Sequence, residues 1–138
     1  MLGVCSSRCA HVHHIYTHAQ AKTSPTGTVL PPPRVVRLRR SGGRIVQGCD
    51  VYIGRRWTFG GWDLPQSQWA NPFTVKKSGS VERAVEEFRR YILGRPDLMD
   101  QVRDLGGKTL GCWCKPGPCH GDVLVALYES RMVYEVLE

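Results

Sequence analysis

Apolar residues in the second half of the chain recur at the spacing of amphipathic helices. After Gly79-Ser80 they fall three and four positions apart, on one stripe of a helix that Ser80 can cap at its N-terminus. A shorter helix is predicted from Pro96, a favoured first-turn residue, to Leu105, where Gly106-Gly107 ends it. The stripe of the longer helix consists of Val81, Ala84, Val85, Phe88, Tyr91 and Ile92.

Other segments carry the patterns of β-strands. Residues 34–40 partly alternate apolar and basic side chains, as on a half-buried strand, and Ser41-Gly42-Gly43 then turns the chain. Further strands are predicted over residues 50–53 and 109–114. The chain between the second strand and the first helix is predicted to be a long loop.

The last predicted helix begins at Cys119 or His120, which makes the order strand, strand, helix, helix, strand, helix. Helices that fall between strands favour an α/β fold with at least one parallel pair of strands. The chain has 138 residues, of which 41% are apolar, as expected for one globular domain. We therefore predict a single small α/β domain over residues 34–138, with a mixed or mostly parallel sheet flanked by helices.

Residues 1–33 lack apolar periodicity and are predicted to be a disordered leader that contains Ser and His and ends in Pro31-Pro32-Pro33. The acid-free leader has too few basic residues to favour a transit peptide, and it lacks the apolar region of a signal peptide. No membrane span is visible, so we expect an intracellular protein, cytoplasmic or nuclear, with reduced thiols. The leader also holds side chains that could bind a transition metal by coincidence: Cys5, Cys9, His11, His13, His14 and His18.

The net charge of +7 is concentrated between Arg34 and Arg56, where seven arginines face one acid, Asp50. Arginine favours two-pronged contacts with phosphate or carboxylate groups, and the alternative is an ordinary solvated basic face. The long loop from Arg56 to Phe73 is rich in aromatic residues, which argues for order and function. Its tryptophans could stack on a ligand, but each one singly is better explained as core: Trp57, Trp62 and Trp69.

Three cysteines crowd around a stiff Lys115-Pro116-Gly117-Pro118 turn. Cys112 and Cys114 share one face of the preceding strand, since side chains alternate along it. The turn delivers Cys119 and His120 to the first turn of the last helix, and His120 is the only histidine outside the leader. This strand, turn and helix are therefore the predicted functional site.

Three interpretations of this cluster stay open. In the first, Cys112, Cys114, Cys119 and His120 bind one zinc ion in a closed site, although the spacing of these ligands is unusual. In the second, Cys114 or Cys119 is a reactive thiolate, with His120 as the base and Asp122 orienting it. In the third, Cys112 is a core residue, while Cys119, His120 and Asp122 only cap the helix.

A helix N-terminus after a turn also presents free N–H groups to an anion. If the third strand runs parallel to the strand that ends at Gly54-Arg55-Arg56, both strand ends meet at one pocket. The arginines would supply positive charge to that pocket and the loop tryptophans a stacking surface. Such a pocket matches a nucleotide or a flexible single strand of nucleic acid.

Several of these segments together resemble domain-of-unknown-function family 4326, seen in phages, other viruses and scattered cellular genomes. The resemblance covers about residues 34–130, and this chain departs from the pattern by a longer stretch between the first two motifs, residues 56–68. The segments that carry it are Val51-Tyr52-Ile53-Gly54-Arg55, Trp69-Ala70-Asn71-Pro72-Phe73, Leu110-Gly111-Cys112-Trp113-Cys114-Lys115-Pro116 and Cys119-His120-Gly121-Asp122-Val123-Leu124. The resemblance implies site residues at Gly54, Arg55, Asn71, Pro72, Phe73, Cys112, Cys114, Pro116, Cys119, His120 and Asp122.

The leading hypothesis is a domain that binds or acts on a nucleotide or a nucleic-acid end at the C-terminal ends of its strands. Whether it is an enzyme stays open, and so does its cofactor, with zinc as one candidate. The alternative is a non-enzymatic, zinc-stabilised module that binds nucleic acid through the Arg34–Arg56 face. The residues expected to contact a ligand are Gly54, Arg55, Arg56, Asn71, Phe73 and Lys115.

Overall fold

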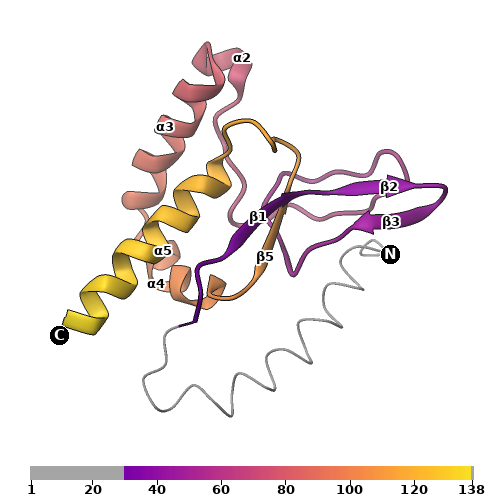
Figure 1. Ribbon diagram of the computed structural model, residues 1–138. Helices are drawn as coiled ribbons and strands as arrows, with labels where there is room; N and C mark the ends of the chain where they lie inside the picture. Colours follow the sequence, from indigo (N-terminus) through magenta and orange to yellow (C-terminus); the bar gives the residue numbers. More distant parts are fainter. Residues whose placement is uncertain (1–29, 138) are drawn as a thin grey trace.

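The computed structural model describes residues 30–137 and, in those, the side chains up to residue 132 (Figure 1). Three parallel strands form the main sheet, in the order β1-β5-β4. The register pairs Arg37 with Cys112 and Tyr52 with Gly111, so the carboxyl ends of all three strands lie at one edge. The predicted α/β fold with a mixed set of strands is confirmed. The strands of this sheet are β1 (Arg34–Arg37), β4 (Val51–Tyr52) and β5 (Thr109–Cys112).

A two-stranded antiparallel hairpin extends beyond the main sheet (Figure 1). Its strands are β2 (Arg39–Ser41) and β3 (Arg44–Gln47). Gly42 and Gly43 form the turn with φ of 57° and 76°, the left-handed conformation that a tight hairpin turn requires. The strand predicted over residues 34–40 is thus two strands with different partners, and β3 was not predicted.

Four helical segments follow the hairpin and β4, and the longest two, α3 and α5, cover one face of the main sheet (Figure 1). The predicted caps hold, because the Ser80 hydroxyl accepts a hydrogen bond from the Arg83 amide at 3.1 Å. The short helix α2 was not predicted. The segments are α2 (Val75–Ser78), α3 (Val81–Leu93), α4 (Pro96–Gln101) with a 3₁₀ turn η2 (Val102–Leu105), and α5 (His120–Leu137).

Apolar side chains form two cores, one on each face of the main sheet. The larger core lies between the sheet and the helices and includes Ile53, Phe88 and Leu124, none of which is exposed. Helix α5 approaches the sheet closely at Gly121, where a Cβ atom would lie 2.8 Å from Ile53 Cδ1. The second core lies under the hairpin and the long loop, and consists of Leu38, Cys49, Trp62 and Leu64.

The described chain begins before Arg34 and is already held against the domain there. The hydroxyl of Tyr128 donates to the Leu30 carbonyl at 2.9 Å, and the Gly107 amide donates to the Pro31 carbonyl at 2.7 Å. The rest of the predicted leader, with its cysteines and histidines, lies outside the described residues. Among residues 30–137 no helix has the length and apolar character needed to cross a membrane.

Candidate functional site

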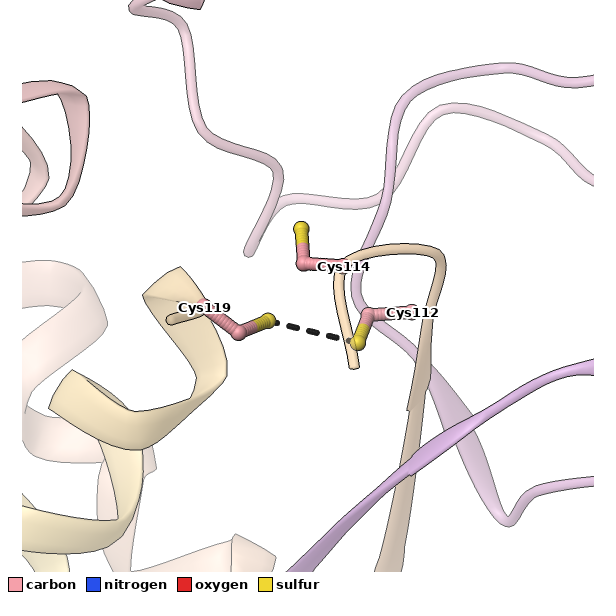
Figure 2. Close-up of side chains that lie close together, drawn as sticks. All are labelled: Cys112, Cys114 and Cys119. Atoms are coloured by element: carbon pink, nitrogen blue, oxygen red, sulfur yellow. Dashed lines mark hydrogen bonds between the residues drawn. The ribbon is translucent and has the colours of Figure 1, made fainter. Parts of the chain in front are cut away.

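The three cysteines of the predicted site come together at the carboxyl end of β5. Cys112 ends that strand, Cys114 lies in the following turn, and Cys119 directly precedes α5 (Figure 2). Their Sγ atoms all lie within 4.8 Å of one another, and those of Cys112 and Cys119 are 3.2 Å apart. Cys112 and Cys119 are buried, whereas Cys114 is exposed. A metal ion could be held by this group of three thiols.

Neighbouring thiols and backbone amides set the protonation of the cluster. Hydrogen bonds from the thiols of Cys114 and Cys119 lower the pKa of Cys112, and backbone amides of the turn lower it further. Hydrogen bonding to Cys112 raises the pKa of both Cys114 and Cys119. The Gly121 amide also donates to Cys119 Sγ at 3.3 Å, so this sulfur caps the first turn of α5. The first thiolate of the cluster therefore forms at Cys112.

His120 is buried beside the cluster but is held by a different partner. Its Nε2 atom lies 2.7 Å from the carbonyl oxygen of Ile53, at the end of β4. Burial lowers the pKa of His120, so the ring is neutral near pH 7, and a carbonyl can only accept, so Nε2 carries the proton. The other nitrogen, Nδ1, lies 3.8 Å from Cys119 Sγ. His120 thus lies next to one thiol, outside the group of three sulfurs.

Asp122 points to the turn and forms no contact with the imidazole that it was predicted to orient. Its Oδ1 atom pairs with Lys115 Nζ at 2.6 Å, and its Oδ2 atom accepts from the Cys119 amide at 3.1 Å. The second bond is that of a capping box, in which an acid in the first turn binds the N-cap amide. The ion pair raises the pKa of Lys115. Both charged groups therefore stabilise the turn and the start of α5.

The predicted convergence of two strand ends is present. Because β4 and β5 are parallel neighbours, the segment after β4 runs beside the cysteine turn. Gly54 is buried there, and a Cβ atom on it would overlap the ring of Tyr52. The Tyr52 hydroxyl in turn donates to the Arg55 carbonyl at 2.5 Å and accepts from Trp113 Nε1 at 2.9 Å. These contacts fix the backbone from which Arg55 and Arg56 project into solvent.

Asn71 anchors the aromatic loop to helix α3. Its side-chain nitrogen donates to the Ala84 carbonyl at 3.1 Å, and its side-chain oxygen accepts from the Phe73 amide at 2.9 Å. The residue is buried, with 9% of its surface exposed. Both ends of the amide are bonded within the protein, so Asn71 shapes the cleft wall and leaves the binding of ligand to its neighbours.

Most predicted site residues line one cleft of about 460 Å³, a volume that suits a small ligand. Lys115, Asp122 and Cys119 are absent from its lining; the first two line a separate shallow hollow beside α5. Two lining residues, Tyr52 and Trp113, were not predicted, although their places at the ends of β4 and β5 were a signal. The predicted residues in the lining are Gly54, Arg55, Arg56, Asn71, Phe73, Cys112, Cys114 and His120.

The three loop tryptophans divide between core and cleft. Trp69 is in the larger core and Trp62 in the second one, as each tryptophan singly was expected to be. Trp57 is 42% exposed and lies against Trp113, with 5.5 Å between the ring centroids. It lines the cleft, whereas Trp62 does not. The longer stretch over residues 56–68 therefore contributes one aromatic ring to the site.

The comparisons with known proteins identify the family. The model of a domain of unknown function, DUF4326, matches residues 36–130, well over half of the chain. The chain belongs to this family. This DUF4326 protein is 46% identical over 114 residues to an uncharacterised protein of Acanthamoeba polyphaga mimivirus, covering 77% of this chain and 87% of the viral protein.

A second relative comes from a bacteriophage. The DUF4326 chain is 38% identical over 94 residues to an uncharacterised 12.4 kDa protein of Enterobacteria phage T4, in the nrdA-td intergenic region; the match covers 65% of this chain and 77% of the phage protein. No solved structure matches the chain significantly. The predicted resemblance to this family and to viral proteins is thus confirmed.

Proposed function

We propose that the cleft at the carboxyl ends of β4 and β5 binds a nucleotide, either free or at the end of a nucleic acid. The observation that carries this proposal is the pairing, in one cleft of about 460 Å³, of two exposed arginines with three aromatic side chains. The topology agrees with it, because parallel α/β sheets bind their ligands outside the carboxyl ends of strands.

The arginines supply the site for phosphate. Arg55 and Arg56 are consecutive, exposed and at the edge of the cleft, and neither forms an ion pair with another residue in the part of the chain that the structure describes. A guanidinium without a carboxylate partner keeps all its donors for a bidentate contact with phosphate. Lys115, by contrast, is engaged by Asp122 and is assigned no ligand.

The aromatic and aliphatic wall suits a base. Trp57, Phe73 and Trp113 line the cleft, and stacking of a base on such a ring contributes about 1–3 kcal/mol. Aliphatic side chains at the start of α3, Val81, Ala84 and Val85, complete the wall. This division of the cleft favours a ligand with one flat apolar part and one anionic part.

Chemistry on the ligand is less favoured than binding. The exposed thiol that faces the cleft, Cys114, has a raised pKa, because its hydrogen bond with Cys112 favours the protonated form. Cys112, whose pKa is lowered, is only 1% exposed. A nucleophile must be both ionised and accessible, and without a metal ion no single cysteine of the cluster is both.

A thermal-shift panel of nucleoside mono-, di- and triphosphates tests the proposal. At least one nucleotide should raise the Tm of the protein, and Arg55→Ala should remove most of that shift. Arg89→Ala is the matched control, because Arg89 lies on α3 beside Glu86 and away from the cleft. A panel without any shift, or an equal shift in Arg55→Ala, would overturn the proposal.

A second candidate function rests on the arginines of β1 and the hairpin. These side chains are exposed, and none forms an ion pair within the described residues. In this candidate the domain binds the phosphate backbone of nucleic acid along that face, and a zinc ion at the cysteines stabilises the fold. The arginines concerned are Arg34, Arg37, Arg39 and Arg44.

A further inference from the structure

We propose that Cys112, Cys114 and Cys119 bind a thiophilic metal ion, such as zinc, whose fourth coordination position opens into the cleft. The ion would then carry an exchangeable water molecule that an oxygen or nitrogen atom of the bound ligand replaces. The metal site stands on the geometry of the sulfurs alone, whereas its contact with a nucleotide rests on the proposed function.

The separation of the sulfurs suits a single ion. Zinc binds thiolates at about 2.3 Å, so two sulfurs on one tetrahedral ion lie about 3.8 Å apart. All three Sγ atoms lie within 4.8 Å of one another, and the closest pair is 3.2 Å apart. A rotation of one side chain by a few tenths of an ångström at its sulfur therefore gives a coordination triangle, and Cys114, in an exposed turn, is free to make it.

The surroundings of the sulfurs are those of metal-bound thiolates. The Gly121 amide donates to Cys119 Sγ at 3.3 Å, and backbone amides of Cys114 and Lys115 donate to Cys112. Such N–H groups aimed at sulfur stabilise negative charge on it and orient the ligand. Three thiolates and a divalent ion leave one net negative charge, which Arg55 across the cleft offsets.

His120 is placed in a supporting position rather than as the fourth ligand. Its Nε2 atom is bonded to the Ile53 carbonyl at 2.7 Å, and neither ring nitrogen belongs to the group of mutually close ligand atoms. The ring is buried against Phe88, with 5.0 Å between centroids, which limits its movement toward Cys112 and Cys114. The side of the sulfur triangle left without a protein ligand faces the cleft that Cys112 and Cys114 line.

An open position distinguishes this site from a structural one. Structural zinc sites have four protein ligands, whereas sites with three protein ligands leave a position for water or substrate. A nucleotide in the cleft offers phosphate oxygens and base nitrogens as replacements for that water. The ion would thus select a ligand by coordination in addition to charge and stacking.

Cobalt titration of the reduced full-length protein tests the site. One equivalent of Co²⁺ should bind with the absorption bands of thiolate coordination, and Cys112→Ser, Cys114→Ser and Cys119→Ser should each weaken binding more than tenfold. The triple variant measures the background from cysteines and histidines elsewhere in the chain, and Cys49→Ala is the single-cysteine control. Equal binding in the triple variant and the parent would overturn the site.

Two measurements test the open position. His120→Gln should keep the cobalt spectrum, and X-ray absorption at the zinc edge of the unaltered protein should show three sulfurs without the outer-shell scattering of an imidazole. An imidazole signal, or loss of the thiolate bands in a folded His120→Gln protein, would show a closed site and overturn this part.

Addition of a stabilising nucleotide to the cobalt protein tests the contact with ligand. The d–d bands should shift, because the exchangeable water is replaced, and Arg55→Ala should require a higher nucleotide concentration for the same shift. A nucleotide that raises the Tm but leaves the bands unchanged overturns the contact and leaves the proposed function intact. A protein that binds cobalt at the cysteines but is stabilised by no nucleotide overturns the proposed function and leaves the metal site intact.

Discussion

The imidazole of His120 binds the carbonyl oxygen of Ile53 across 67 positions of sequence, with 2.7 Å between Nε2 and that oxygen. This contact joins the first residue of α5 to the residue that precedes Gly54-Arg55. The cysteine turn and the arginine-bearing strand end are therefore held in a fixed relationship by one buried side chain. It is the contact on which the geometry of the cleft most depends.

Removal of this side chain should destabilise the domain. His120→Ala leaves the Ile53 carbonyl without its donor and opens a cavity beside Phe88, which together cost about 2–4 kcal/mol of unfolding free energy. His120→Gln can still donate a hydrogen bond, and it should lose less. Urea denaturation measures both. Equal losses in the two variants would show that the hydrogen bond adds nothing to packing.

Asn71 should be important for stability even though it lines the cleft. Asn71→Ala removes hydrogen bonds to the Ala84 carbonyl and the Phe73 amide in a buried place, for which we expect a loss of about 2–3 kcal/mol. Gln68→Ala is the control, because the Gln68 amide bonds to Gln101 at the surface and its loss should cost less than about 0.5 kcal/mol. Similar Tm values for the two variants would contradict the anchoring role of Asn71.

The exposed and buried tryptophans should separate binding from folding. Trp57→Ala should change the unfolding free energy little, because the side chain is 42% exposed, but it should weaken nucleotide affinity at least fivefold through lost stacking. Trp69→Ala should cost about 3–5 kcal/mol of stability, since that ring is 4% exposed in the larger core. Unfolding curves and nucleotide titrations of both variants give the comparison. Unchanged affinity in Trp57→Ala would place the base elsewhere.

If the second candidate function holds, nucleic-acid affinity should fall steeply with salt. Arg37→Ala combined with Arg39→Ala should lower the slope of log affinity against log salt by about 2, roughly one unit for each lost phosphate contact. Arg89→Ala combined with Arg90→Ala is the matched control on α3, where Glu86 already pairs with both arginines. Fluorescence anisotropy with a single-stranded oligonucleotide provides the slopes. Identical slopes in both double variants would exclude the β1 and hairpin face.

The elements that depend on neighbours in sequence were predicted well. The stripe from Val81 to Ile92 and the cap at Ser80 specify α3, because helix bonds and caps join residues three or four positions apart. The strand, turn and helix around the cysteines were predicted for the same reason. The hairpin strand β3 was not, since a short strand acquires its conformation from its partner, and α2 is too short for a periodic pattern to be visible.

The site divides in the same way. Residue types and spacing were enough to bring three cysteines to one turn and to pair that turn with Arg55 and Arg56 through parallel strands. They did not indicate that His120 binds the Ile53 carbonyl, or that Asp122 binds Lys115 and the Cys119 amide. A polar side chain beside several possible partners is assigned only when packing fixes which one it can reach.

The sequence by itself determined the helices with their caps, the class of the fold and the segments that form the cleft, because these depend on local periodicity and on the direction of strands. Tertiary structure alone decided which tryptophan is left to face a ligand and which polar groups are already bonded. Those outcomes depend on contacts between residues far apart in the chain, such as Trp113 Nε1 with the Tyr52 hydroxyl, 61 positions away. Such contacts form only once the sheet and helices have packed, and no local pattern encodes them.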